Sequence, residues 1–262
     1  MNLDKITPLI LTYNEAPNIQ RTLENLAWAK QIVIIDSFST DKTLDILKKF
    51  KQIILFQKQF ESFADQCNYG LSKIVSEWVL SLDADYLVTK ELIQAIQLLP
   101  DQTLVNSFRV QFKYCVFGKP LQGTLLPPRK VLYRGKYAKY SNDGHSHKVI
   151  VDGLSEQLSG YIYHDDRKPL SRWLWAQDRY MILETQKLLN TPNAELSIGD
   201  KIRKFKIFSP FIVFFYCLFL KKGILDGWEG WYYAMQRMLA ETLLVIHLIE
   251  AEKLGNKPQS LE

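Results

Sequence analysis

The sequence contains little cysteine, and its first residues predict no secretion signal. Its three cysteines, Cys67, Cys115 and Cys217, are odd in number and widely spaced, and none forms a Cys-x-x-Cys pair. This pattern supports neither a disulfide framework nor a zinc site, so we expect a reducing, cytoplasmic environment. The first residues, Met1 to Lys5, run directly into a strand-like segment without the basic start and long apolar core of a secretion signal.

Two kinds of phosphate-binding loop are also absent. Neither Gly-x-Gly-x-x-Gly nor a Gly-Lys-Ser/Thr loop follows the first strand-like segment, so dinucleotide-binding and P-loop folds lose their main support. The formal net charge of +5 is mild, and it gives no reason to expect a nucleic-acid partner. No Gly/Ser tract or repeat divides the 262 residues, of which 47% are hydrophobic. This composition predicts one well-packed α/β domain, with or without an appendage.

Strand-like and helix-like segments alternate through the first hundred residues. Apolar runs predict strands at 6–11, 31–35, 53–56 and 79–82. The segments between them predict helices at about 18–29, 41–50 and 65–74. This order implies parallel strands with right-handed crossovers, that is, a doubly wound sheet. Such sheets bind ligands at the carboxyl ends of their strands.

The strand that ends at Leu82 delivers two carboxylates to that edge. Asp83 and Asp85 follow the apolar run from Val79 to Leu82, with one residue between them. Mg²⁺ and Mn²⁺ prefer oxygen ligands and usually take only one or two protein carboxylates plus the phosphates of a substrate. We therefore expect a divalent cation here. The alternative is an ordinary strand end followed by a solvated turn.

The loops after the first two strands carry further polar and aromatic residues. Thr12-Tyr13-Asn14-Glu15 follows the first strand, and a loop that begins at Asp36 follows the second. An aromatic ring stacks on a base, and a carboxylate accepts the N3 hydrogen of a uracil, so these loops suit a nucleotide. Ser39-Thr40-Asp41 is also typical of helix N-capping, which explains Ser39 and Thr40 better than it explains Asp36.

These motifs resemble, in order and spacing, those of the family 2 glycosyltransferases. The resemblance rests on Thr12 to Glu15, the Asp36 to Thr43 loop, Gln66-x-Asn68 and Leu82-Asp83-Ala84-Asp85. It covers residues 5–150 and, in the bacterial lipopolysaccharide-core and exopolysaccharide branch, the whole chain. The resemblance implies a Rossmann-like, doubly wound mixed α/β sheet of the glycosyltransferase-A type. It also implies a nucleotide-diphosphate sugar donor and Mg²⁺ or Mn²⁺ as cofactor.

The resemblance further implies roles for single residues. Asp85 would ligate the cation, Asp83 would lie near the ribose or sugar, and Glu15 would support the nucleotide pocket. Ser37 stands where many relatives have a second aspartate, which leaves the identity of the donor's nucleobase open. The residues expected to bind the nucleotide sugar are Thr12, Tyr13, Glu15, Asp36, Gln66, Asn68 and Asp83.

The catalytic base is expected farther along the chain. An inverting transfer needs a group that deprotonates the acceptor hydroxyl, and the Glu-Asp or Val-His-Glu segments in which many relatives place it are absent. Asp143 is our candidate, with His145 or His147 in support or in its place, because all three lie in one polar, Gly-containing segment. Asp152-Gly153 predicts a hairpin turn, because strand-like residues precede it.

A dense polar cluster begins at His164. We expect His164 to complete the metal or diphosphate site, with neighbouring cationic side chains that pair with phosphate oxygens. The alternative is an ordinary helix N-terminus with Pro169 in its first turn and acidic residues that complement the helix dipole. The catalytic domain is accordingly expected to span residues 1–165, followed by a helical region at 166–262.

The helical region contains a short, very apolar segment. Ile207 to Leu220 includes Pro210 and is shorter than the ~20 helical residues that cross a bilayer core. Lysines precede it at Lys201 to Lys206 and follow it at Lys221-Lys222, and an aromatic cluster comes next. This combination predicts an interfacial segment at an anionic membrane surface. The alternative is a helical hairpin that packs on the catalytic domain or on the second subunit of a homodimer.

Together these features predict an inverting, metal-dependent glycosyltransferase that is peripherally bound to the cytoplasmic face of the membrane and acts in cell-envelope polysaccharide synthesis. Its partners would be a nucleotide-diphosphate sugar and a glycan or lipid-linked acceptor, without nucleic acid. Two other functions stay open. One is a sugar-1-phosphate nucleotidyltransferase, although its early Gly-rich loop is absent. The other is a non-catalytic scaffold that binds nucleotide sugar.

Overall fold

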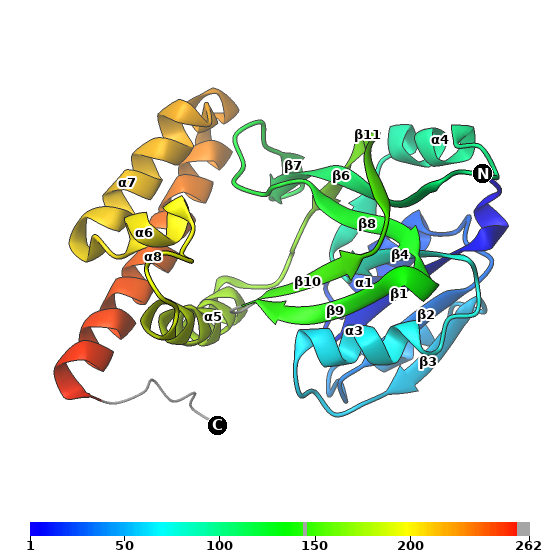
Figure 1. Ribbon diagram of the computed structural model, residues 1–262, viewed down its shortest axis with the longest axis horizontal. Helices are drawn as coiled ribbons and strands as arrows, with labels where there is room; N and C mark the ends of the chain where they lie inside the picture. The colour runs from blue at the N-terminus through cyan, green and yellow to red at the C-terminus, as the bar shows by residue number, and fades with distance from the viewer. Residues whose placement is uncertain (144–145, 256–262) are drawn as a thin grey trace. The chain divides into compact units, whose positions relative to one another are not determined.

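The computed structural model describes residues 1–143 and 146–255 (Figure 1). The chain divides into two compact units. The sheet unit comprises Met1–Pro120 and Leu126–Arg167, and the helical unit comprises Leu121–Leu125 and Lys168–Glu262. The short segment Leu121–Leu125 therefore belongs to the helical unit although sheet-unit residues lie on both sides of it in the sequence.

The first half of the sheet unit alternates strands and helices, as the sequence predicts. A 3₁₀ turn at Leu3–Lys5 precedes the first strand. The elements are β1 (Ile6–Thr12), α1 (Ile19–Asn25), β2 (Ile32–Asp36), α2 (Thr43–Leu47), β3 (Ile53–Gln57), α3 (Phe63–Leu71) and β4 (Trp78–Asp83). The predicted strands are correct to within one residue at each end. The helices are shorter than predicted, because turns replace their last residues.

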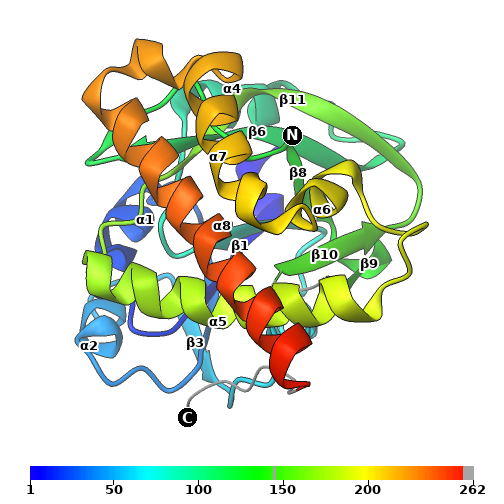
Figure 2. The same ribbon diagram turned by 90° about the vertical axis from the view of Figure 1, so that its left-hand side faces the viewer.

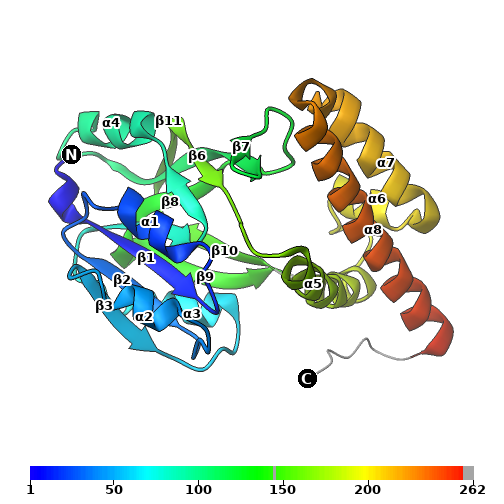
Figure 3. The same cartoon turned by 180° about the vertical axis from the view of Figure 1, so that it is seen from behind.

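The remaining strands complete a mixed sheet. The elements are β5 (Tyr86–Val88), α4 (Lys90–Leu98), β6 (Val105–Val116), β7 (Lys119–Pro120), β8 (Arg129–Arg134), a 3₁₀ turn (Gly135–Tyr137), β9 (Ala138–Asp143), β10 (Ser146–Val151) and β11 (Leu154–His164). The order in the main sheet is β3-β2-β1-β4-β8-β6-β11-β5. Figure 3 shows the parallel strands β1, β2 and β3 side by side. β8 runs antiparallel to β4 and β6, so the expected mixed, doubly wound sheet is confirmed.

Helices cover both faces of the parallel strands, which explains why these strands are continuous apolar runs in the sequence. Ile10 and Ile34 point into a core that includes side chains of α1 and α2. Leu9 and Val33 point into a second core that includes side chains of α3. Because successive strand residues face opposite sides, adjacent apolar residues serve different cores.

The hairpin predicted at Asp152-Gly153 is wrong. β10 pairs with β9 in a separate two-stranded sheet, whereas β11 joins the main sheet between β6 and β5. Gly153 has φ +96°, and a Cβ at this position would lie 2.5 Å from Asn106 Nδ2, so only glycine fits the turn between the two sheets. An Asp-Gly pair indicates a turn locally, but it does not determine which strands pair on either side of that turn.

The helical unit is built on two long helices, α5 (Leu170–Asn190) and α8 (Trp228–Leu254). Figure 2 shows α8 crossing α5, and Met181, Leu188, Leu244 and Leu248 pack between them. The connecting elements are α6 (Ile198–Arg203), a 3₁₀ turn (Lys206–Phe208), α7 (Ser209–Phe215), a π-helical turn (Tyr216–Leu220) and a 3₁₀ turn (Gly223–Asp226). Among the described residues, no helix is both long and apolar enough to cross a membrane.

The interior of the helical unit contains an ionic network. Arg203 of α6 pairs with Glu184 of α5 at 3.2 Å and with Glu241 of α8 at 3.1 Å. Asp200 lies 3.6 Å from Arg203, and all three carboxylates are buried. Burial opposes the charge of Arg203, but the neighbouring carboxylates outweigh this effect and raise its pKa further. One guanidinium therefore joins three helices.

Candidate donor and cation site

Three strands bring predicted site residues to one edge of the sheet. β1 is paired in parallel with both β2 and β4. Thr12 at the end of β1 lies opposite Asp36 at the end of β2, and Leu11 lies opposite Asp83 at the end of β4. Because parallel strands end on the same side, Thr12, Asp36 and Asp83 share the carboxyl edge, where α/β sheets bind ligands.

The loops after β1 and β2 are joined by side-chain hydrogen bonds. Asn14 adopts a left-handed backbone conformation with φ 55°. Its backbone N–H donates to Ser39 Oγ at 2.9 Å, and its Oδ1 accepts from the Thr40 N–H at 2.8 Å. The Glu15 N–H donates to Thr43 Oγ1 at 2.8 Å. The two loops therefore form one wall of the site instead of two independent segments.

Asp36 is completely buried in the centre of this wall. Its Oδ1 accepts from Thr12 Oγ1 at 2.9 Å and from Ser39 Oγ at 2.5 Å. Its Oδ2 accepts from the Ser39 N–H at 2.9 Å and from Gln57 Nε2 at 3.2 Å. The hydroxyl of Ser39 thus holds Asp36, and Asp41 instead accepts the N–H of Thr43 at the start of α2, at 2.8 Å. The geometry makes Asp36 the internal brace of both loops.

Two aromatic rings lie on the solvent side of the same loops. Tyr13, which the sequence predicts as a nucleotide contact, is 43% exposed. Phe38 is 48% exposed and has φ 58°, a conformation that is rare for an aromatic residue. Phe38 is not among the residues predicted from the sequence. Its strained backbone, which turns the loop after Asp36, is a signal that only the structure provides.

Gln66 and Asn68, both on α3, have different surroundings. Gln66 is buried and donates from Nε2 to Ser37 Oγ at 3.1 Å and to the Lys58 carbonyl at 3.0 Å, while its Oε1 has no partner among the described residues. Asn68 uses both of its polar atoms on the backbone of Tyr140 in β9. Asn68 therefore fastens β9 to α3, and its contact with the donor stays a prediction.

Asp85 and His164 lie side by side. His164 is the last residue of β11 and is paired with Tyr86 in β5. Its Nε2 lies 3.1 Å from Asp85 Oδ2, and its Nδ1 is buried without a partner among the described residues. Burial by itself lowers the pKa of His164, but the charge of Asp85 and the hydrogen bond to it prevail, so the pKa is raised above its ordinary value. The structure brings together two residues that the sequence assigned to one cation.

The spacing of this pair fits a divalent cation. Neighbouring ligands of an octahedral Mg²⁺ lie about 3 Å apart when each ligand is about 2.1 Å from the ion. The 3.1 Å between Asp85 Oδ2 and His164 Nε2 matches that value. Within residues 1–143 and 146–255, no group of three or more His, Cys, Asp or Glu side chains is arranged to hold a metal ion. Asp85 and His164 are the candidate ligands, and a cation held by them would take its other ligands from substrate phosphates and water.

Asp83 acts on the buried phenol of Tyr86. Burial, followed by the negative charge of Asp83, raises the pKa of Tyr86 well above its ordinary value, so the phenol stays protonated. Arg129 Nη1 lies 3.5 Å from the Tyr86 hydroxyl and its guanidinium lies 5.8 Å from the centre of the Phe112 ring. A cationic side chain thus accompanies the carboxylates on this side of the sheet.

The predicted base segment is described only in part. Asp143 is the last residue of β9, and its backbone lies opposite Ser146 of β10. His147 lies opposite Asn142. His145 lies outside the described residues. β9 is connected to β4, the strand that precedes Asp85, because the Tyr140 hydroxyl donates to Ser81 Oγ of β4 at 2.8 Å.

The chain belongs to glycosyl transferase family 2. The model of this family matches residues 9–145, just over half of the chain. The matched range includes all predicted donor residues, Asp85 and Asp143, whereas His164 lies beyond it. The predicted family is therefore confirmed, and the protein is a glycosyltransferase. Family membership favours this activity over the nucleotidyltransferase alternative.

Two relatives match over nearly the whole chain, and a third matches one third of it. An uncharacterized glycosyltransferase of Rickettsia felis is 23% identical over 265 residues, covering 95% of this chain and 91% of the relative. The lipopolysaccharide core biosynthesis glycosyltransferase LpsC of Rhizobium meliloti is 22% identical and covers 97% of this chain and 95% of its own. The glycosyltransferase SunS from the SPbeta prophage of Bacillus subtilis is 35% identical over 92 residues, or 33% of this chain and 21% of its own.

The chain is also similar to solved structures. The structure of S. aureus TarS residues 1–349 in complex with UDP-GlcNAc has a TM-score of 0.48 and 17% identity, and the match covers 95% of this chain and 92% of that one. Glucosyl-3-phosphoglycerate synthase from Mycobacterium tuberculosis, in complex with Mn²⁺, UDP and glucosyl-3-phosphoglycerate, has a TM-score of 0.47 and 10% identity. That match covers 72% of this chain and 81% of the other.

Proposed function

We propose that this glycosyltransferase uses a divalent cation and transfers a sugar, with inversion, from a nucleotide-diphosphate sugar to a glycan or lipid-linked acceptor of the cell envelope. One observation carries the proposal. Asp85 and His164 come together at 3.1 Å on the sheet edge where the loops after β1 and β2 form a wall. Two candidate cation ligands beside such a wall suit a diphosphate that is attached to a nucleoside.

The wall supplies the nucleoside contacts in this proposal. Tyr13 and Phe38 present exposed rings for stacking. Asp36 shapes the loops from inside through Thr12 and Ser39. Gln66 contributes an amide oxygen that has no partner in the described structure, and the Glu15 backbone is held against Thr43. Asp83, at the end of β4, is nearest along the chain to Asp85 and is assigned to the ribose or sugar.

Asp85 and His164 would hold the cation, which when bound would neutralise negative charge on the leaving diphosphate. The chain itself would move the proton. The carboxylate of Asp143, or a histidine of the same segment, takes the proton of the acceptor hydroxyl while the acceptor oxygen bonds to the anomeric carbon. The bond from that carbon to the diphosphate oxygen breaks, and the nucleoside diphosphate leaves.

The proposed acceptor class is supported by the relatives and by the surface of the helical unit. A relative that matches 97% of this chain is named for lipopolysaccharide core biosynthesis. A growing envelope glycan on a lipid would be presented at a membrane, and we infer that the enzyme works peripherally at the cytoplasmic face of that membrane. The structural support is an apolar strip on the helical unit.

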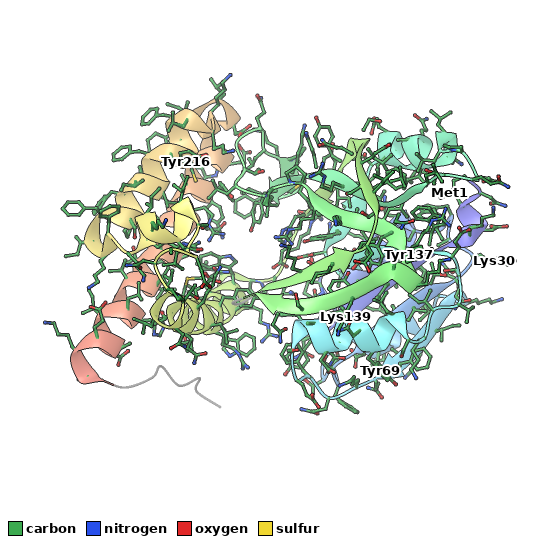
Figure 4. All side chains as sticks on the ribbon, in the orientation of Figure 1. Met1, Lys30, Tyr69, Tyr137, Lys139 and Tyr216 are labelled. Carbon is green, nitrogen blue, oxygen red and sulfur yellow. The ribbon has the colours of Figure 1, made fainter. Side chains whose placement is uncertain are left out.

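This apolar strip runs from Phe205 to Leu220. Tyr216, labelled in Figure 4, lies on it. The strip borders a shallow groove of about 720 Å³ and consists of Phe205, Phe208, Phe211, Ile212, Phe215, Tyr216, Phe219 and Leu220. Its phenylalanines are between 53% and 68% exposed. The opposite side of the same segment is buried through Ser209, Pro210, Cys217 and Leu218. The strip is therefore an outward face and not part of the core.

Lysines beside the strip favour an anionic phospholipid surface over an apolar protein partner. Lys201 and Lys222 are exposed on either side of the segment in sequence. The ammonium of Lys221 lies 5.7 Å from the centre of the Tyr216 ring. Apolar insertion and basic flanks act together at such surfaces, and each lysine contributes about 1 kcal/mol near anionic lipid.

The enzymatic proposal is tested by release of nucleoside diphosphate from a panel of nucleotide sugars, with Mn²⁺ and with truncated envelope glycans as acceptors. Asp85→Asn should lower turnover about a hundredfold or more, because loss of several kcal/mol of charge stabilisation corresponds to two or more powers of ten. Asp45→Asn, an exposed aspartate on α2 that pairs only with Lys48 among the described ion pairs, is the matched control. Near wild-type transfer by Asp85→Asn would remove the basis of the cation assignment.

The membrane proposal is tested by co-sedimentation of the full chain with vesicles of increasing anionic content. A variant with Phe208→Ser, Phe211→Ser and Phe219→Ser should lose binding, and replacement of Lys221 and Lys222 should weaken it mainly at low salt. Leu98→Ser, at an exposed leucine on α4, is the control. Vesicle binding that is unchanged in the phenylalanine variant would refute the strip as the lipid-binding face. A concentration-dependent dimer that this variant abolishes would show that the strip binds a second copy of the chain instead of lipid.

A further inference from the structure

Helix α1 has an unusual buried side. Asn18, which precedes the helix, and Arg21, Thr22 and Asn25 follow the spacing i, i+3, i+4 and i+7, which places them on one face. Asn18 and Thr22 are 0% and 1% exposed. A polar face that is buried must find hydrogen-bond partners, because burying unpaired polar groups is costly. We call these four residues the polar stripe of α1.

One half of the polar stripe holds the segment that contains Asp85. Thr22 Oγ1 donates to the Ala84 carbonyl at 2.7 Å. Asn25 accepts from the Val88 N–H at 2.7 Å and donates to the Val88 carbonyl at 3.0 Å. Asp85 is thus flanked in the sequence on both sides by backbone that α1 fixes.

The other half holds the segment that follows His164. Arg21 Nη1 donates to Asp165 Oδ2 at 2.6 Å, and Arg21 Nη2 donates to the Asp165 carbonyl at 2.9 Å. Asn18 Oδ1 accepts from the Arg167 N–H at 2.9 Å. Because a fork of two donors fixes direction as well as distance, Arg21 orients the backbone directly after His164.

The two segments also meet each other. The Asp165 N–H donates to the Asp85 carbonyl at 3.0 Å. Asp85 and His164 are therefore neighbours on a backbone frame whose two halves are both attached to one helix. The partners that orient metal ligands commonly act in this way, and their loss typically costs about 10–100-fold in metal affinity.

We propose that the polar stripe of α1 positions the two candidate cation ligands, Asp85 and His164. Arg21, Thr22 and Asn25 touch neither cation nor donor in this role. They set the separation of Asp85 and His164 before the cation arrives, so that binding does not have to order two independent strand ends. The inference rests on the cation site of the proposed function and adds the residues that build it.

The test measures Mn²⁺ affinity directly, by the electron paramagnetic resonance signal of free Mn²⁺ with and without UDP, and does not depend on turnover. Thr22→Val keeps the shape of the side chain but removes the donor, and Arg21→Lys keeps the charge but removes the fork. Each should weaken Mn²⁺ binding about tenfold or more. Thr22→Ser should restore it, and Gln20→Ala, at an exposed position of α1, should leave it unchanged.

The outcomes separate the two proposals. If the wild-type protein binds no Mn²⁺ even with UDP, the cation of the proposed function is refuted and the positioning role falls with it. If the wild-type protein binds Mn²⁺ and both Thr22→Val and Arg21→Lys bind it equally well while their melting temperatures fall, the stripe is only structural and the inference alone is overturned. Weaker binding by folded Thr22→Val, restored in Thr22→Ser, supports it.

Discussion

Replacement of Asp36 distinguishes a brace from a ligand. Asp36 is the last residue of β2, and the family resemblance assigns it to the nucleoside. In the structure it is fully buried, and its two oxygens accept four hydrogen bonds from Thr12, Ser39 and Gln57. We therefore expect Asp36→Ala to act first on stability and only through it on nucleotide binding.

The expected size follows from the donors that lose their acceptor. Gln57 is exposed and can turn to water. The backbone N–H and the hydroxyl of Ser39 and the hydroxyl of Thr12 are buried and cannot. Each buried donor left without a partner costs about 1–3 kcal/mol, so Asp36→Ala should lower the free energy of unfolding by about 3–9 kcal/mol. Asp36→Asn keeps one acceptor oxygen and turns its NH₂ toward the hydroxyls, so it should lose less.

Equilibrium urea unfolding followed by circular dichroism measures this difference. With a slope of about 1–3 kcal/mol per molar urea, the midpoint of Asp36→Ala should fall by about 1 M or more, and that of Asp36→Asn should lie between it and the wild type. Asp45→Ala, on the exposed side of α2, should change stability by no more than about 0.5 kcal/mol. If both Asp36 variants unfold like the wild type but lose nucleotide affinity, Asp36 is a ligand and the brace is refuted.

Three further perturbations test other parts of the structure. Gly160→Ala should destabilise the sheet unit by more than about 1 kcal/mol, visible as a lower melting temperature, because φ is +89° and the new Cβ would lie 2.5 Å from the backbone nitrogen of Leu92. Arg203→Leu should cost about 3–5 kcal/mol in urea unfolding, because it leaves buried carboxylates unpaired. Burial raises the pKa of Cys115 to about 12 from 9.0. Its thiol therefore contributes stability that is complete below pH 9 and lost as the pH rises toward 12, and Cys115→Ala should flatten this alkaline decline in melting temperature.

The sequence predicts the parallel half of the sheet well for a physical reason. Strands buried on both faces must be apolar throughout, so β1, β2 and β4 stand out as runs that end in polar residues. Their ends then share one edge by topology, which is why Thr12, Asp36 and Asp83 were placed together without any knowledge of contacts.

Pairings between distant segments are not determined by local pattern. The approach of His164 to Asp85 depends on β11 lying between β6 and β5, and the sequence around either residue does not specify that order. The same limitation produced the wrong hairpin at Asp152-Gly153. The hydrogen bonds of Asn68 and Asn18 could not be predicted for a related reason, because an asparagine in a helix or at its start is equally compatible with a ligand, a cap and a brace.

The polar stripe of α1 and the outer face of the helical unit reverse the usual distribution of residues, each in its own way. Buried faces of helices are normally apolar, yet α1 buries Asn18 and Thr22, and the helical unit buries Glu184 and Glu241. Buried polar side chains favour the one arrangement in which all of them have hydrogen-bond or ion-pair partners, whereas an apolar face permits several arrangements. The helical unit in turn leaves the strip from Phe205 to Leu220 in contact with solvent. In the proposed function this exposed apolar face would be covered by lipid, while the buried ionic network would keep the shape of the unit.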